Sequence, residues 1–292
     1  MIDQRKVVIG LLAAVAVLVS GCSPDIVIVS DPLLEAIIPS RQEWEREISV
    51  VARQNRVRVG FEWPSAELLD QLDFDEIVSR TDAPKYLLSP YASLFANELA
   101  TRHPERGFIV TQGGPHDAAN ITTVSYAWNE GWQAAGNWVA NWLAEDAQRR
   151  AVVFASEEDQ TQRERVAALR EAVERAGEQI EIRLLAESIR GDATVSSLAD
   201  SDFSGTTLVI FMAHGSDQST FTSLYDSATF LALPGVYIRD GSEQVLLAVR
   251  ADLSEALAAH LSMPSARVVT APVTVEARES SRDNGNDANE VE

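Results

Sequence analysis

Short apolar runs alternate with amphipathic segments along nearly the whole chain, and this alternation restricts the fold more than any other feature. The run 25–30, DIVIVS, is almost continuously β-branched, which is typical of a strand buried on both faces of a parallel sheet. Residues 40–54 follow with apolar side chains at helical spacing, and Ser40 with Glu43 forms a predicted capping box. The same order of strand and helix continues to residue 114.

The pattern starts again after residue 120, so the sequence predicts two successive β/α series. The predicted strands are 25–30, 57–63, 85–90, 107–114, 121–126, 150–156, 180–188, 206–215, 235–241, 245–249 and 267–275. Helical segments lie between most of them, including one that opens at Ser65 and others at 93–104, 129–146 and 252–263. Since right-handed crossovers place helices on both faces of such sheets, we predict an α/β fold with two doubly wound parallel-sheet lobes joined by a hinge.

The predicted domain organisation follows from these series and from the composition of the two ends. We expect a signal peptide at 1–21, a first lobe at 22–120 with 242–265 returning to it, a second lobe at 121–241 with 266–277, and a disordered acidic tail at 278–292. The tail lacks aromatic residues and has almost no apolar content, so it cannot bury enough surface to fold.

The single cysteine of the chain, Cys22, follows a charged start and an apolar run of about 13 residues at 7–19. Such a run is too short to span a hydrocarbon core of about 30 Å and is typical of a secretory signal. The tetrapeptide Val19-Ser20-Gly21-Cys22 resembles the lipobox of bacterial lipoproteins. That resemblance implies cleavage before Cys22, acylation of Cys22 (including palmitate), and firm attachment to the bilayer of the cell envelope.

Composition excludes several function classes. The net charge is −20, with no basic stripe for phosphate contacts, so we expect no nucleic-acid partner. The four histidines are scattered, and the stretch 213–217, AHGSD, is no triad, because triads assemble in space and not from sequence neighbours. We therefore expect no catalytic residues, no metal and no cofactor, and a protein that is not an enzyme.

Candidate ligand contacts are polar or aromatic side chains at strand ends, because ligands of parallel sheets bind beyond the carboxyl ends of the strands. The predicted ligand-binding residues are Asp31, Trp63, Ser89, Tyr91, Gln112, Gly113, Trp128, His214 and Asp240. Asp31 and Asp240 can accept hydrogen bonds from sugar hydroxyls, or can simply cap turns. Trp63 can stack on a ring, or pack at a lobe edge.

Four tryptophans share one face of the predicted helix 129–146 and its start. We interpret Trp132, Trp138 and Trp142 as core residues that pack on the sheet, helped by the small residues of the same helix. Trp128 lies at the start of this helix, beside the predicted crossover between lobes. It is therefore the tryptophan of this group that we expect to contact a ligand.

Three stretches are similar to type I periplasmic binding proteins, and most closely to the basic membrane protein or purine nucleoside receptor lipoproteins. They are 98–114, 124–144 and 235–261. The resemblance implies two lobes that capture a small polar ligand, nucleoside or sugar-like, for an ABC permease. It also implies a monomer exposed to the periplasm or exterior.

One loop departs from the nucleoside-binding pattern. That group has an aspartate-rich loop with phenylalanine and asparagine after its first strand, whereas residues 30–40 here read SDPLLEAIIPS. Asp31 is kept, but the aromatic and the amide are missing. The alternative is therefore a divergent binding-protein fold that serves as a surface interaction or sensor lipoprotein without transport.

Overall fold

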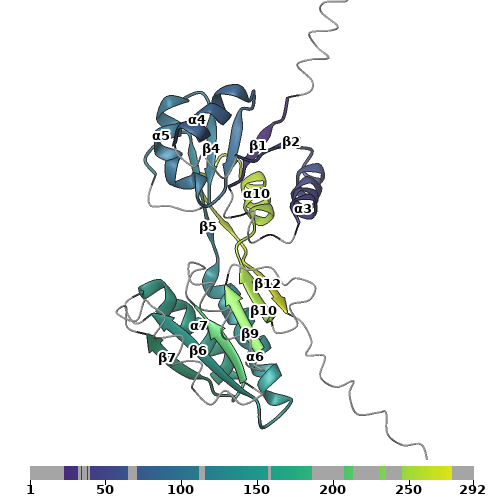
Figure 1. The fold of residues 1–292 in the computed structure, drawn as a ribbon, viewed down its shortest axis with the longest axis vertical. Helices are drawn as coiled ribbons and strands as arrows, with labels where there is room; N and C mark the ends of the chain where they lie inside the picture. Colours follow the sequence, from purple (N-terminus) through teal and green to yellow (C-terminus); the bar gives the residue numbers. More distant parts are fainter. Residues whose placement is uncertain are drawn as a thin grey trace, which may run out of the picture. The chain divides into compact units, whose positions relative to one another are not determined.

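The computed structural model describes residues 23–31, 34, 38, 40–64, 71–111, 116–156, 159–185, 207–212, 230–234 and 245–277. These residues form two compact units (Figure 1). Unit 1 contains the described residues up to Ser125 together with Leu253–Ala271, and unit 2 contains Tyr126–Asp252 and the residues from Pro272 onward. Each unit has its own sheet flanked by helices, so the predicted α/β fold with two mainly parallel sheets is confirmed.

Unit 1 is built on a sheet with the strand order β11-β5-β4-β3-β1-β2. Its strands are β1 (Ile26–Val29), β2 (Val59–Glu62), β3 (Lys85–Leu88), β4 (Gly107–Val110), β5 (Ile121–Tyr126) and β11 (Val268–Ala271). Its helices are α3 (Arg41–Gln54), α4 (Gln71–Arg80), the 3-10 turn η1 (Ala92–Phe95), α5 (Ala96–Arg102) and α10 (Leu253–Ser262). Strands β1 to β5 pair in parallel with their neighbours, so their carboxyl ends lie at one edge of the sheet.

The core of unit 1 has two layers because side chains alternate between the faces of a strand. Val27, Val29 and Leu88 pack with the apolar side chains of α4 and α5 on one face. Ile28 and Leu87, which point to the other face, are fully buried, and α3 and α10 pack against each other. In Figure 1, α4 and α5 lie on one side of the strands of unit 1, and α3 and α10 on the other.

Unit 2 is built on a second sheet with the strand order β12-β10-β9-β8-β6-β7. Its strands are β6 (Arg150–Ser156), β7 (Glu181–Leu185), β8 (Thr207–Phe211), β9 (Phe230–Pro234), β10 (Val245–Arg250) and β12 (Thr274–Ala277), and its helices are α6 (Trp128–Ala144) and α7 (Gln160–Arg175). Strands β6 to β10 pair in parallel, whereas β12 is antiparallel to β10.

The tryptophan face of α6 is largely core, as predicted. Trp132 and Trp142 are buried, and Trp138 is partly buried against the same apolar cluster. Close packing of α6 on α7 depends on Gly136, because a Cβ at this position would lie 2.5 Å from the carbonyl oxygen of Leu169. Nearer the starts of the two helices, Arg165 of α7 lies over the ring of Trp128 of α6.

Some predictions of local structure are confirmed, and others differ in which sheet a strand joins. Ser40 caps α3 by accepting a hydrogen bond from the backbone N–H of Glu43 at 3.4 Å. The predicted single strand 267–275 instead forms β11 in the first sheet and β12 in the second, with Pro272 and Val273 between them. Strand β10 joins the second sheet, whereas the sequence pattern predicts 242–265 in the first lobe, because an apolar run does not specify its partner strand.

Several predictions fall outside the described residues. They are the signal segment with Cys22, the start of the helix that opens at Ser65, the strand 235–241 and the tail 278–292. A strand that the sequence did not predict, β9, lies at Phe230–Pro234. Within the described residues, no helix combines the length and the apolar character needed to cross a membrane.

Candidate ligand-binding site

Three of the predicted site residues lie where strands of the first sheet end. Asp31 lies just beyond β1, Trp63 follows β2, and Ser89 follows β3. Since β1 pairs in parallel with both β2 and β3, these residues share the carboxyl edge of the sheet of unit 1. This is the edge at which ligands of parallel α/β sheets bind.

Asp31 organises the loops at this edge. Its Oδ1 accepts a hydrogen bond from the backbone N–H of Leu34 at 2.8 Å, and its Oδ2 accepts one from the N–H of Tyr91 at 3.3 Å. The residue is only 2% exposed. The carboxylate therefore ties the turn after β1 to the turn after β3, and direct contact with a ligand stays a prediction.

Trp63 and Tyr91 both pack against aromatic neighbours. The indole Nε1–H of Trp63 donates to Glu45 Oε1 at 2.8 Å, and its ring meets the edge of Trp44 with centroids 5.4 Å apart. The ring of Tyr91 lies 5.7 Å from that of Phe95. These contacts fix the orientation of both rings at the rim of unit 1, where both remain partly exposed.

Ser89 differs from its polar neighbours at the same edge because its hydroxyl is unpaired. It is fully buried, and its Oγ has no hydrogen-bond partner. Ser93, by contrast, donates to the carbonyl of Leu88 and accepts from the backbone N–H of Thr111 at 3.2 Å. The Ser89 hydroxyl is therefore a free donor and acceptor in unit 1.

In unit 2, the first turn of α6 and the second turn of α7 bring Trp128 and Arg165 together. The N-terminus of α7 follows the carboxyl end of β6, and Asp159 caps the helix by accepting from the backbone N–H of Gln162 at 3.1 Å. The guanidinium carbon of Arg165 lies 4.3 Å from the ring centroid of Trp128, which is the distance of a cation–π contact. The predicted site residue Trp128 thus has a charged neighbour at the carboxyl side of the second sheet.

Arg165 is a buried cation with unpaired donors. The residue is 4% exposed, and neither its Nε nor its Nη1 has a hydrogen-bond partner. Burial lowers the pKa of the guanidinium, while the field of Asp159 opposes this shift. Leaving donors of a charged group buried and unpaired costs about 1–3 kcal/mol or more, so an oxygen-rich ligand that accepts from them would recover a large free energy.

Sequence reasoning missed Arg165, although its spacing carried a signal. Gln162 and Arg165 lie on the same helical stripe as Val166 and Leu169, and this stripe faces the core. A charged side chain on an apolar stripe near the start of a helix is unusual, because arginine is almost never fully buried without a partner. This departure from the pattern was the available clue.

A second buried arginine of unit 2, Arg250, is paired with two carboxylates. Arg250, at the end of β10, donates from Nε to Asp252 Oδ1 at 2.9 Å and pairs through Nη1 with Glu276 of β12. Tyr126 donates its hydroxyl hydrogen to the backbone carbonyl of Asp252 at 3.1 Å. This network satisfies its own charges, whereas Nε and Nη1 of Arg165 have no hydrogen-bond partner.

The remaining predicted site residues lie outside the described residues. They are Gln112, Gly113, His214 and Asp240. In the part of the chain that the structure describes, no group of three or more His, Cys, Asp or Glu side chains is placed to hold a metal ion.

Comparison with known proteins finds matches in structure only. No protein-family model matches this chain, and no curated protein matches it either. A periplasmic ribose ABC transporter protein from Conexibacter woesei matches with a TM-score of 0.53 and 14% identity over 87% of this chain and 92% of that chain. The Caulobacter myo-inositol binding protein matches with a TM-score of 0.51 and 15% identity over 88% and 94%.

A regulator has a similar structure as well. A transcriptional activator of the comK gene from Bacillus halodurans matches with a TM-score of 0.56 and 12% identity, over 88% of this chain and 90% of that chain. At such identities the likeness concerns the fold, which transport proteins and regulators share. The chain therefore has the fold of type I periplasmic binding proteins.

Proposed function

We propose that this chain is an exported solute-binding lipoprotein that captures a small polyhydroxylated ligand for an ABC transporter and catalyses no reaction. The observation that carries the proposal is the buried guanidinium of Arg165, with two unpaired nitrogens, lying over the indole of Trp128. Proteins with this fold include a ribose ABC transporter protein and a myo-inositol binding protein, which agrees with such a ligand.

The chemistry of the Trp128–Arg165 pair fits a ring that carries hydroxyl groups. A guanidinium offers its N–H donors in a fixed plane, so separate ligand hydroxyl oxygens can accept from Nε and from Nη1, each along its own direction in that plane. The indole offers a flat apolar face for the C–H side of a sugar or cyclitol ring. The ribose of a nucleoside has the same hydroxyl pattern, so the ligand class includes nucleosides as well as free sugars.

Unit 1 supplies complementary groups in this proposal. The free hydroxyl of Ser89 can donate to or accept from a ligand, and Asp31 with Tyr91 holds the loops at the same sheet edge in place. A ligand that binds residues of both units stabilises the conformation in which both reach it. Ligand binding would then shift the population toward that closed form, which a permease can recognise.

Calorimetric titration of the full chain with ribose, myo-inositol, adenosine and, as a comparison class, amino acids tests the ligand class. We expect saturable binding of at least one polyhydroxylated compound and none of the amino acids. Arg165→Met should weaken binding roughly 10- to 100-fold, because a hydrogen bond to a charged donor contributes about 1.5–3 kcal/mol. Arg165→Lys keeps the charge but loses the planar donor pair, and should restore only part of the affinity.

Arg170→Met is the matched control, because Arg170 lies on the same helix but is exposed and pairs with Glu174. It should bind the ligand as the unchanged protein does. Equal affinities of the Arg165→Met and Arg170→Met variants would contradict the assigned role of Arg165. A folded protein that binds no compound of the panel would contradict the ligand class.

The membrane anchor is the second part of the proposal, and it depends on the lipobox-like sequence before Cys22. Several acyl chains on Cys22 would hold the protein at the bilayer firmly, with only a short tether before β1. Expression in a bacterial host with a palmitate analogue in the medium should label the unchanged protein and leave Cys22→Ser unlabelled and outside the membrane fraction. Equal membrane recovery of both proteins would contradict the anchor.

A sensor or surface interaction role without transport is the second candidate. It is favoured by the loop SDPLLEAIIPS, which departs from the nucleoside-binding pattern, and by the fold shared with a transcriptional activator. Ligand-dependent cross-linking in native membranes separates the two candidates. A permease partner supports transport, and a signalling protein in its place supports the sensor role.

A further inference from the structure

A cavity of about 170 Å³ lies at the amino edge of the first sheet, at the opposite strand ends from Asp31 and Ser89. Its walls include the first residues of β3, β4 and β5 and the segment that follows α10. The cavity is many times larger than the roughly 15 Å³ that a single buried water requires. It therefore has room for a small molecule, and nothing in the proposed solute-binding role uses it.

The ionisable groups around this cavity are all basic. Lys85, His260 and Arg267 line it, and none of its lining residues is acidic. This is unusual in a chain with 44 acidic residues and only 24 arginines and lysines. Most other arginines that the structure describes lie beside a carboxylate, whereas neither Lys85 nor Arg267 forms an ion pair with one.

The contact with Lys85 determines which nitrogen of the His260 ring carries the proton. Lys85 Nζ lies 3.1 Å from His260 Nε2, and an ammonium group can only donate, so Nε2 must be the acceptor. The proton of the neutral imidazole is then on Nδ1, which is buried and has no hydrogen-bond partner. Burial, followed by the charge of Lys85, lowers the pKa of His260 to about 4, which agrees with a neutral ring.

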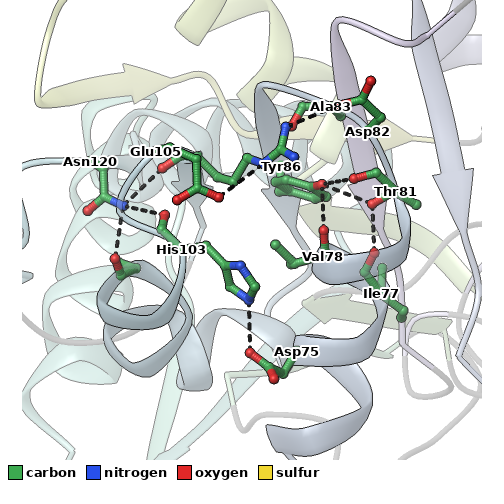
Figure 2. Close-up of polar contacts among 12 residues, drawn as sticks. Asp75, Ile77, Val78, Thr81, Asp82, Ala83, Tyr86, His103, Glu105 and Asn120 are labelled. Atoms are coloured by element: carbon green, nitrogen blue, oxygen red, sulfur yellow. Dashed lines mark hydrogen bonds and ion pairs between the residues drawn. The ribbon is translucent and has the colours of Figure 1, made fainter.

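Arg267 and Asn120 hold the remaining walls in place. Arg267 donates from Nη2 to the carbonyls of Asp117 at 3.2 Å and Ala118 at 2.9 Å. The side-chain amide of Asn120 donates to the carbonyls of Ala100, His103 and Arg106, as Figure 2 shows. The loops that form this edge are thus fixed by hydrogen bonds to backbone carbonyls, and the charges of Lys85 and Arg267 are left without a counter-ion.

We propose that this cavity is a second binding site, which holds a small oxyanion between Lys85 and Arg267, with His260 positioning the ammonium group. An oxyanion such as phosphate or a carboxylate has several acceptor oxygens, which suits an ammonium and a guanidinium that both lack acidic partners. The site lies away from the carboxyl edge where the solute is proposed to bind. The proposal therefore does not depend on the proposed transport function.

Thermal unfolding of the full chain in sodium phosphate, sulfate or acetate, compared with sodium chloride at equal ionic strength, tests the proposal. We expect at least one oxyanion to raise the unfolding midpoint saturably above the chloride value, since ligand that binds only the folded state stabilises it. Because the net charge is −20, a general attraction of anions to the surface is disfavoured. A saturable effect would therefore report a local site.

Two variants and one control locate the effect. Lys85→Met and Arg267→Gln should each weaken the oxyanion at least tenfold, whereas Arg53→Gln, an exposed arginine in the last turn of α3, should change nothing. Arg267 is also exposed, so its replacement leaves the core intact even if the Lys85 variant fails to fold. The phosphate, sulfate and acetate arms then distinguish a phosphate-like from a carboxylate ligand.

The imidazole of His260 provides a direct measurement in the unchanged protein. Its ring ¹⁵N signals should show the Nδ1–H tautomer at pH 7 and shift saturably when the oxyanion is added. An equal response to chloride, a ring that does not respond to any oxyanion, or full affinity in Arg267→Gln would each overturn the proposal.

Discussion

Two buried arginines in the described part of unit 2 have opposite surroundings. Arg250 is 8% exposed and lies between two carboxylates, on Asp252 and Glu276. Arg165 is 4% exposed, and lies over the indole of Trp128 with two nitrogens unpaired. Buried charges in proteins are normally paired with an opposite charge. Arg250 follows this rule, and Arg165 does not.

In our proposal, this difference distinguishes an arginine with a structural role from one that binds the ligand. Polar groups that are satisfied within the fold stabilise it, and their removal should lower stability. Polar groups that are buried and unsatisfied destabilise the free protein, and a ligand that pairs with them recovers this free energy. The same contrast applies in unit 1, where Ser93 is paired and Ser89 is not.

The largest effect is expected from removing the paired arginine. Arg250→Met leaves two carboxylates without their cation, and breaking a buried ion pair in this way typically lowers the free energy of unfolding by about 3–5 kcal/mol. Arg165→Met should leave the unliganded protein as stable as before, or more stable, because it removes a desolvated charge. Urea unfolding of both variants measures the difference, and a loss above about 2 kcal/mol for Arg165→Met would contradict the binding role.

A smaller change in the free energy of unfolding is expected from His260, whose ring stays neutral in the folded protein down to about pH 4. Its pKa is about 4 in the folded protein and near 6.5 when unfolded, so only the unfolded chain gains a proton between these values. Stability should therefore fall as the pH drops from 6.5 to 4, by about 3 kcal/mol in all. Unfolding measured across this range should show the loss in the unchanged protein and a flatter profile in His260→Gln, whose amide oxygen can still accept from Lys85.

Below pH 4, carboxyl groups such as that of Asp25 contribute to the pH dependence of stability. Asp25 keeps a pKa below its ordinary value, chiefly through its hydrogen bond with the side chain of Arg58, so its contribution is lost only at lower pH. A His260→Gln variant that loses stability between pH 6.5 and 4 as steeply as the unchanged protein would show that the histidine is not the responsible group.

The smallest effect is expected from the two serines of unit 1. Ser93→Ala removes the acceptor for the buried N–H of Thr111 and should lower the free energy of unfolding by about 1–3 kcal/mol. Ser89→Ala removes a hydroxyl with no partner and should leave stability within about 0.5 kcal/mol. Equal losses in chemical unfolding would show that Ser89 also has a structural role.

Local features of the fold could be predicted from the sequence. The β-branched run of β1, the Ser40 cap of α3 and the tryptophan face of α6 depend on the period of nearby side chains, and all three are confirmed. Which strands pair with each other in a sheet could not be predicted in the same way. The stretch 267–275 divides between two sheets because pairing depends on strands far away in the sequence.

The positions of some candidate residues could be predicted, while their contact with a ligand stays a prediction. Strand ends and the first residue of α6 led to Asp31, Ser89 and Trp128, because topology alone places such residues at a sheet edge. Arg165 was missed because a single arginine on a helix is usually exposed, and only its three-dimensional neighbours show that it is buried and unpaired. Whether a charge has a partner is a long-range property of the folded chain.

The backbone passes between the two units three times, and neither unit is a continuous stretch of sequence. The sheet of unit 1 receives its edge strand β11 only after residue 267, when unit 2 has already supplied most of its own strands. During synthesis on a ribosome, the amino-terminal half must therefore wait, incomplete, until nearly the whole polypeptide has emerged. No single cut of the gene would yield two fragments that each carry one complete sheet.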